Sequence, residues 1–587
     1  MRLFKIFFKS FLSLFAVMRM SGMRPANPLS LVLFAVFFYV FAQLQDERFE
    51  ERVTMADSVL SCILGVLFSV FTLAVCHADI LTDFTNPVFR VIILALTAFG
   101  LFTIYYHLVA WLLQASELIS LTGAEYQRPW LPCIAVVLCL ICWTPHFLFA
   151  YPGVMTPDSI NQYAQVVGAY ELSNHHSVIH TLLLGMFYNI GLYFTGNVYF
   201  GLAVCTMAQM LFMALVVGYV VKTLQKADVI SPVLLAVICF YALMPYHGAY
   251  AVTLWKDIPF AGSITLFSAA LLRFLLRPRS GLLHSNPQKL AVSEYFTLIL
   301  PYIFSGVMIS LLRTNGWYAF LATLPFILLI YRRNWKMMLP VHLIILFLVL
   351  FVKYPCMNIY EIKQADFVES LSVPLQQIAC VVARGEPLTR EEQDFIGSIM
   401  DLEQVPAQYQ PDVSDNIKNL VRQGNPTYLE ANKSAFFKTW FSIGLAHSRS
   451  YFDAYVAQTK GYWYPDTTCA VGLDEGIYPN EFGLTWQPIL RGSIVVKIRE
   501  ILFKLHELFP LYGALWSMGL LFWIILIIAA VCLRTGEVEK ALICLPCIAL
   551  VLTLCIAAPV ASEFRYAYPL FYGLPLFLVA PFVHAEG

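Results

Sequence analysis

The sequence predicts an all-α polytopic membrane protein with about 11–14 transmembrane helices, since a span takes about 20 apolar residues. Of its 587 residues, 59% are hydrophobic and 13% are charged, whereas soluble domains carry about 25% charged residues. The mean hydropathy is +0.71. This composition excludes a large soluble enzyme. Lys+Arg and Asp+Glu balance at 37 each, so no bulk positive charge is present to attract nucleic acid.

Fourteen apolar runs are candidate spans, and several of them are close to the minimum length. They lie near residues 28–44, 57–77, 88–113, 130–150, 178–195, 198–222, 229–253, 257–277, 296–312, 316–331, 337–352, 510–533, 539–560 and 566–583.

Residues 353–508 contain no such run, and they carry 14 Lys/Arg and 19 Asp/Glu. They predict a mixed, mainly helical extracytoplasmic domain between two membrane blocks. The block before it is a transmembrane module at 27–352 with a loop of unusual polarity at 151–177. The block after it comprises C-terminal transmembrane helices at 509–587.

The N-terminal residues 1–26 predict a basic amphipathic segment. Arg2, Lys5 and Lys9 recur at helical spacing, and Phe and Leu fill the other face. A signal peptide has an unbroken apolar core, which Lys9 interrupts. We therefore expect an uncleaved helix on the cytoplasmic leaflet.

Two connections are rich in basic residues, which places them on the cytoplasmic side. These residues are Arg277, Arg279 and Lys289 in the first connection, and Arg332, Arg333 and Lys336 in the second. The 353–508 domain and the turn at 561–565 then lie outside, and we expect a multi-pass protein of the cell membrane.

One conflict follows if every run is a full span, because loop 151–177 then falls inside while Trp255–Asp257 falls outside. Either a run before residue 150 does not cross the bilayer, or one within 178–253 is re-entrant. Pro245, His247 and Gly248 make 229–253 a candidate broken segment, since irregular backbone at membrane depth needs protein or water around it.

Loop 151–177 is the first region that suggests chemistry. Pro157-Asp158 can begin a short helix, where a carboxylate is favoured by the helix dipole. Asp158 is therefore either a helix cap or a functional carboxylate. A strip rich in side-chain amides, which includes Gln162, follows it at the membrane surface.

His176 and His180 are four residues apart and would share a face if both were helical. With Asp158 or Asp257 they are candidate ligands for a divalent metal. They are equally candidates for solvated loop residues, or for donors that hold a phosphate.

Further charged residues lie at span ends. Lys256 and Asp257 begin one span, and beside Trp255 they are either an interfacial anchor or part of a site. Arg313 and Asn315 interrupt two apolar runs, and Arg565 lies in a similar break. Three cationic sites together with two carboxylates suggest more than anchoring.

These residue types suit sugar transfer from a lipid-phosphate donor. A carboxylate can take the proton of an acceptor hydroxyl, and cations can stabilise the charge on a departing phosphate. A lipid-linked leaving group would explain a site at the membrane surface.

The order of several short motifs resembles the GT-C superfamily of polytopic glycosyltransferases, most closely an uncharacterised bacterial multi-pass family of it. The motifs are YPGVMTPDS (151–159), NHHSVIHTLL (174–183), WKDIPF (255–260), LLRTNGWY (311–318), SVPLQQIA (372–379), GYWYP (461–465) and EFRYAYP (563–569). The resemblance implies a polyprenyl-phosphate sugar donor, with Asp158 as catalytic base and Asp257 as a second acidic residue. It also implies donor-phosphate contacts for Arg313 and Arg565. The three or four runs before the Asp158 loop depart from the single span usual in that superfamily.

The expected partners are the donor, a glycan, lipid or protein acceptor, and membrane lipids, but no nucleic acid. Lys256, Arg313, Asn315, Arg565, His176, His180 and Gln162 are the candidate donor-binding residues. The cofactor is open, with a divalent metal as one candidate. The alternatives are a transporter or flippase for lipid-linked saccharides, or a polysaccharide polymerase or ligase.

Overall fold

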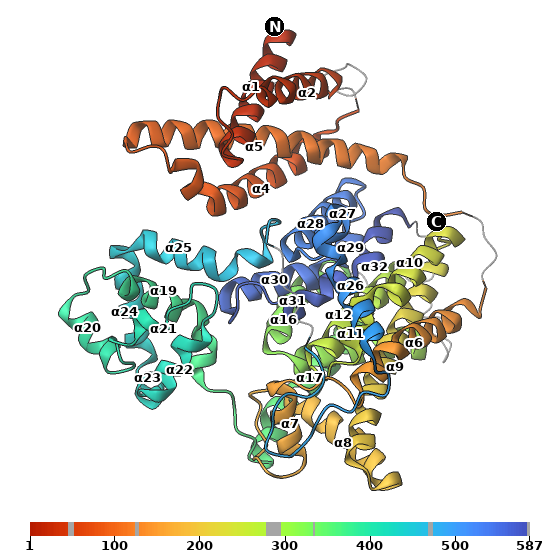
Figure 1. Cartoon of the computed structure of the whole chain (residues 1–587). Helices are drawn as coiled ribbons and strands as arrows, with labels where there is room; N and C mark the ends of the chain where they lie inside the picture. The colour runs from red at the N-terminus through yellow and green to blue at the C-terminus, as the bar shows by residue number, and fades with distance from the viewer. Residues whose placement is uncertain (45–51, 124–127, 277–294, 333–334, 468–473, 584–587) are drawn as a thin grey trace. The chain divides into compact units, whose positions relative to one another are not determined.

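The computed structural model describes residues 1–44, 52–123, 128–276, 295–332, 335–467 and 474–583. Within these ranges every regular element is a helix, and strand-like pairing is limited to isolated bridges (Figure 1). The predicted helical membrane class is therefore confirmed. The domain at 353–508, predicted to be mixed, contains helices and no strand in its described part.

Seven described helices are long and apolar enough to cross a membrane, or eight if one bent pair counts as a span. The seven are α4 (Met55–Leu81), α5 (Pro87–Ala115), α6 (Leu131–Ala150), α8 (Val178–Thr195), α9 (Val198–Gln225), α12 (Asp257–Leu275) and α17 (Trp335–Phe351).

Six further apolar helices have 10–17 residues, so fewer long spans are found than the predicted 11–14. The physical reason is that turns divide several of the apolar runs. Run 566–583, for example, breaks at Gly573 into α31 (Phe564–Tyr572) and α32 (Leu574–Val579). Of the residues used to orient the chain, Arg277, Arg279, Lys289 and Arg333 lie outside the described ranges.

The chain divides into two compact units. One comprises Met1–Ser120 with Leu526–Ala541, and the other comprises Leu121–Ile525 with Leu542–Gly587.

The first unit includes α1 (Arg2–Met20), α2 (Leu29–Leu44), α4 and α5. Within the predicted segment 1–26, α1 packs onto α5 with the small side chains of Ser13 and Ala16 buried, while Phe4, Phe7 and Phe11 are exposed. In the same unit Arg534, at the end of α28 (Met518–Arg534), forms a buried ion pair with Asp57 and reaches Glu117 at 2.8 Å.

Close packing of α1 on α5 depends on Gly100. A Cβ at this position would lie 2.1 Å from the carbonyl oxygen of Leu12 and 2.7 Å from Ala16 Cβ. Gly100→Val is therefore expected to force the helices apart and to cost about 1–3 kcal/mol or more. Tryptic cleavage within residues 2–20 of the purified protein should become faster. Ala95→Val, on an exposed face of the same helix, is the control, and equal cleavage in both variants would contradict the prediction.

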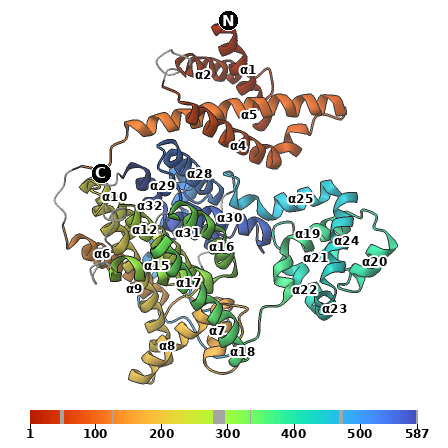
Figure 2. The ribbon, with the colours of Figure 1, turned by 180° about the vertical axis from the view of Figure 1, so that it is seen from behind.

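In the second unit α12 is the central helix, and 89% of its apolar window is buried. It packs against α9, α15 (Leu300–Leu312) and α31 (Figure 2). Its first residue is Asp257. The most deeply buried membrane helix thus begins at a candidate site residue.

A broken helix lies where the sequence suggested one. α10 (Ser231–Leu243) and α11 (Pro245–Ala251) meet at an angle of 52°, because Pro245 has no N–H to continue the α10 hydrogen bonds. Gly248 allows α11 to approach α6, since a Cβ there would lie 2.4 Å from His146. The segment after this break carries Trp255–Asp257.

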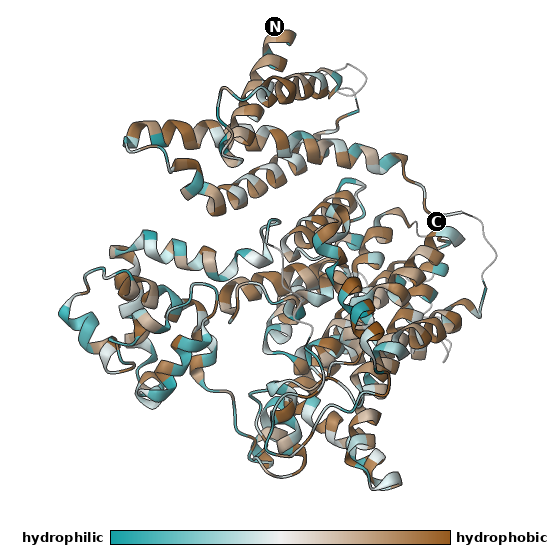
Figure 3. Ribbon diagram, in the orientation of Figure 1, coloured by the Kyte–Doolittle hydropathy of each residue, from teal (hydrophilic) through white to brown (hydrophobic). Residues whose placement is uncertain are grey.

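Residues 367–459 form what we call the helical lobe. Its helices are α19 (Ser372–Ala383), α20 (Arg390–Gly397), α21 (Val405–Gln408), α22 (Asp415–Gln423), α23 (Pro426–Ala431), α24 (Lys433–Ala446) and α25 (Ser448–Thr459). They enclose a core of their own, in which Ile378, Ile417 and Phe436 are fully buried. The lobe has a mixed hydropathy, whereas α6 and α9 are mainly hydrophobic (Figure 3).

The lobe is hydrogen-bonded to residues 558–561, which follow α30 (Leu545–Ala557). Gln458 donates to the Ala558 carbonyl at 2.7 Å, the Ser414 backbone donates to Pro559 at 2.9 Å, and Ala561 donates to Asp412 at 2.8 Å. The backbone that leads into α31 is thus held by the lobe.

Candidate functional site

Asp158 lies in the first turn of α7 (Pro157–Val166), as the sequence predicted. Pro157 is suited to this position because the first helical residue needs no N–H partner. The Ser159 hydroxyl donates to the Leu254 carbonyl at 2.7 Å, and Val154 pairs with Thr253 in a parallel bridge. These contacts bring α7 beside the segment that carries Trp255–Asp257.

Gln209 fixes the shape of that segment. Its side-chain amide donates to the carbonyls of Ala251 at 3.0 Å and Thr253 at 2.7 Å. The Trp255 indole then donates to Thr156 Oγ1 at 2.7 Å. A buried polar network therefore fixes the backbone that carries Lys256 and Asp257. This backbone is not a solvent-exposed loop.

Arg565, in the first turn of α31, pairs with Asp158. Its Nη1 donates to Asp158 Oδ2 at 3.0 Å, and its Nε lies 3.6 Å from Glu563 Oε1. The guanidinium carbon lies 4.7 Å from the centre of the Trp255 ring. The Nε atom is buried and makes no hydrogen bond, so this cation retains an unused donor.

A second ion pair joins Arg313 to Asp257, and it is more deeply buried. The side chains are 10% and 1% exposed, respectively. Arg313 lies 4.3 Å from the centre of the Tyr566 ring, and Arg565 lies 5.2 Å from the same ring. Tyr566 thus links the two ion pairs into one cluster, which we call the ion-pair cluster: Asp158, Arg565, Asp257, Arg313 and Tyr566.

Charges around Asp158 favour its ionised form. Burial raises the pKa of this carboxyl, but Arg565, followed by His176 and Lys256, outweighs burial and holds the pKa below its usual value. Burial lowers the pKa of Lys256. Burial raises the pKa of Glu563, so the two carboxyls beside Arg565 differ in acidity.

His176 lies near Asp158, but it does not share a helix face with His180. The reason is that α8 begins at Val178, with Ser177 as its cap. Burial and the charge of Lys256 lower the pKa of His176 to about 4, so the ring is neutral at pH 7. Its Nδ1 is buried and makes no hydrogen bond.

His180 and Gln162 contact each other, and their side chains do not line an open site. His180 Nδ1 and Gln162 Oε1 are 2.8 Å apart, and the Gln162 amide also donates to Thr181 at 3.0 Å. Both residues are buried, and they brace α7 against α8. Asn315 lies in the first turn of α16 (Thr314–Ile330), two residues beyond Arg313.

No group of three or more His, Cys, Asp or Glu side chains converges as metal ligands among the described residues. The metal candidates Asp158 and Asp257 each pair with an arginine, and His180 is bonded to Gln162. Among the described residues, the partners of Asp158 and Asp257 are therefore guanidinium groups.

A loop that the sequence did not assign to the site runs along it. The Met155 backbone donates to the Gly476 carbonyl at 2.9 Å, and the Tyr478 backbone donates to the Met155 carbonyl at 2.9 Å. Trp486 donates to the Phe149 carbonyl at 2.8 Å. These loop residues fall within the predicted 353–508 domain. They do not belong to the helical lobe, however, and they pack against the transmembrane module instead.

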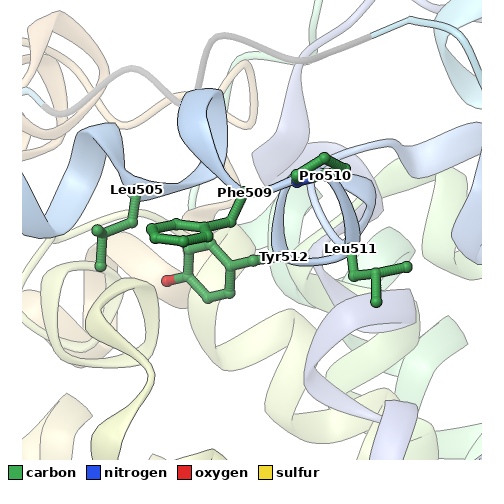
Figure 4. A pocket seen from close by; sticks show the side chains of 5 residues that line it. All are labelled: Leu505, Phe509, Pro510, Leu511 and Tyr512. Atoms are coloured by element: carbon green, nitrogen blue, oxygen red, sulfur yellow. The ribbon is translucent and has the colours of Figure 1, made fainter.

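A cavity of about 460 Å³ lies elsewhere, where α26 (Ser493–Leu508) meets α27 (Pro510–Ala514) (Figure 4). It is lined by Leu505, Phe509, Pro510, Leu511 and Tyr512. None of these residues belongs to the ion-pair cluster, and the lining is almost wholly apolar.

A family comparison matches residues 114–586, which include the whole ion-pair cluster. The chain belongs to the DUF6020 family, a family of unknown function. No curated protein and no solved structure matches the chain significantly. The match leaves out residues 1–113, and thus α1, α2, α4 and nearly all of α5, so the DUF6020 region corresponds largely to the second unit.

Within the DUF6020 region, sequence reasoning singled out Glu563 and Tyr566 only as neighbours of Arg565, without a role of their own, and it missed Gln209. Glu563 and Tyr566 flank Arg565 in the EFRYAYP motif, so this motif held a usable signal. Gln209 lies within an apolar helix, where a lone amide indicates a buried partner without saying which.

The ion pair predicts how stability depends on pH. Because the folded pKa of Asp158 is lowered, its pairing stabilises the fold above the usual carboxyl pKa of about 3.9 and is lost as the pH falls through the folded value. The unfolding temperature of Asp158→Asn should therefore be less sensitive to pH below about 4 than that of wild type. An identical acid dependence in both proteins would contradict this prediction.

Proposed function

We propose that this protein is a membrane glycosyltransferase of the GT-C type. It moves a sugar from a polyprenyl-phosphate-linked donor to a glycan, lipid or protein acceptor at the extracytoplasmic face of the cell membrane. The observation that supports this most is the ion pair between Asp158 and Arg565. The carboxyl is held in its ionised form, and the guanidinium has one nitrogen, Nε, that makes no hydrogen bond. Asp158 follows the apolar helix α6 and Arg565 lies at the start of α31, so both lie at the ends of membrane-type segments, where a lipid-linked substrate can reach them.

The proposed reaction uses Asp158 as general base. The acceptor hydroxyl gives its proton to Asp158 Oδ1 while its oxygen forms a bond to the anomeric carbon of the sugar. The bond from that carbon to the phosphate oxygen breaks, and the electron pair leaves with the lipid phosphate. The products are the glycosylated acceptor and the lipid phosphate, with the proton on Asp158.

Arg565, Arg313 and Lys256 stabilise the developing phosphate charge, because fixed cations aimed at such charge are usually the largest catalytic contribution. In the absence of donor, Arg565 neutralises Asp158. A bound phosphate would compete for Arg565, which would leave the carboxylate free to accept the hydroxyl proton.

A transporter or flippase for lipid-linked saccharides is the second candidate, and the α10–α11 break favours it. Discontinuous helices line the binding sites of many transporters. Beside this break His247 is buried, and its Nδ1 lies 2.8 Å from the Tyr568 hydroxyl. Intramembrane ionisable groups of this kind commonly serve transport.

The test uses the purified full chain in nanodiscs with a panel of labelled polyprenyl-phosphate sugars and an envelope extract as acceptor source. Release of lipid phosphate above that of empty nanodiscs would support the transferase. Arg565→Ala should weaken saturable donor binding. If no donor is bound or cleaved, while vesicles containing the protein move a lipid-linked saccharide between leaflets, the transferase proposal fails and the transporter replaces it.

A further inference from the structure

Helix α24 of the helical lobe is apolar on both of its sides. On its inner side Phe436 and Ile443 are fully buried in the lobe core. On its outer side Phe437, Phe441 and Leu445 are 42%, 60% and 70% exposed. The outer face of α24 thus combines three exposed large apolar side chains with the exposed polar residues Lys438 and Ser442.

The three outer residues form one stripe. They are spaced four residues apart, so their side chains stack on the same face of the helix. At 1.5 Å per residue the stripe extends about 12 Å along α24. We call Phe437, Phe441 and Leu445 the α24 stripe.

Three basic residues lie in or just after α24, and the first of them, Lys433, pairs with Glu430 at 3.2 Å. Lys433, Lys438 and Arg449 are exposed in or just after the helix, and no Asp or Glu occurs in residues 433–452. The preceding part of the lobe, residues 367–432, has the opposite charge balance, with ten acidic and four basic residues. Positive charge is thus concentrated around the exposed apolar stripe on an otherwise acidic lobe.

The lobe is connected to one candidate membrane span and hydrogen-bonded next to one shorter apolar helix. The span that begins at Trp335 ends at Ile359, eight residues before the lobe. The lobe is also hydrogen-bonded to Ala558 and Pro559, directly after the apolar helix α30. It is therefore held close to the bilayer by the chain itself.

We propose that the α24 stripe docks into the headgroup region of an anionic phospholipid membrane. Phe and Leu side chains on one face, with Lys and Arg beside them, are the pattern of helices that lie in the membrane interface. Each basic residue near an anionic surface contributes about 1 kcal/mol of attraction. The absence of acidic residues from 433–452 fits a negatively charged surface, and docking would restrict the lobe that holds residues 558–561.

The test places the photoreactive residue p-benzoyl-phenylalanine at position 441 of the full chain. The protein is reconstituted in nanodiscs of phosphatidylcholine, with or without phosphatidylglycerol, and is irradiated before mass spectrometry. The same probe at position 390, an exposed residue of α20, is the positional control. We expect lipid adducts at 441 that increase with phosphatidylglycerol, and few adducts at 390.

Charge variants test the electrostatic part of the proposal. Lys438→Glu should lower the adduct yield at 441 about fivefold or more, the factor that corresponds to one basic residue near the surface. Arg390→Glu changes the net charge of the lobe equally and should leave the yield unchanged. Equal yields at 441 and 390 would overturn the proposal. So would adducts between position 441 and a second copy, or another segment, of this chain, because the stripe would then be covered by protein.

Discussion

Asp158→Asn is expected to lower the rate of lipid-phosphate release about 10²–10⁴-fold, the usual contribution of a general base. The amide has nearly the shape of the carboxylate but cannot take the hydroxyl proton. The effect should appear in kcat once a donor has been identified, while the amount of folded protein in the membrane changes little. Release and saturable donor binding, measured on the same nanodisc preparation, separate the chemical step from binding.

Glu171→Gln is the matched control for this variant. Glu171 lies thirteen residues after Asp158, in the same loop, and pairs with Lys363 through side chains that are 76% and 69% exposed. It tests whether loss of any ion pair in this loop affects turnover. If Asp158→Asn retained full turnover, Asp158 would not be the base, and if both variants lost it, the loss would reflect the loop and not the proton transfer.

Asp257→Ala is expected to produce the largest loss of stability in the site, about 3–5 kcal/mol. Asp257 is 1% exposed, and its removal leaves the buried Arg313 without a counter-charge. Thermal unfolding in one detergent should therefore show a markedly lower midpoint. Glu500→Ala, which breaks an exposed pair with Lys504, is the control and should cost no more than about 1 kcal/mol.

The double variant Asp257→Ala/Arg313→Met separates stability from chemistry. Replacing both members of a buried pair is often nearly neutral for stability, so the double variant should unfold at a higher temperature than Asp257→Ala. If it also lacks phosphate release, Arg313 and Asp257 serve the reaction. A double variant that is less stable than Asp257→Ala would mean that Arg313 stabilises the fold without Asp257, through its contact with Tyr566.

The helical class was predictable from the composition, and the main charged residues of the candidate site were predictable from polar breaks in the apolar runs. Both signals can be read locally in the sequence. Asp158, Lys256, Asp257, Arg313 and Arg565 were all singled out in this way. Their pairing was not predictable. Asp158 and Arg565 are 407 residues apart, and nothing in the sequence says which arginine pairs with which carboxylate.

The histidine and glutamine predictions show where spacing misleads. His176 and His180 have the spacing of a shared helix face, but Ser177 caps the helix between them. Gln162 was grouped with donor-binding residues because it is polar and near the membrane, whereas its amide is used up in bracing α7 against α8. His180 and Gln162 thus bond to each other, whereas the buried Nδ1 of His176 makes no hydrogen bond.

The attachment of the helical lobe to residues 558–561 has a mechanical consequence. Hydrogen bonds from the lobe hold this segment, and Arg565 is only four residues beyond its end. A displacement of the lobe therefore pulls on the backbone that sets the distance between Arg565 and Asp158. Any large molecule that binds the lobe would then act on Arg565, the ion-pair partner of Asp158, without touching it.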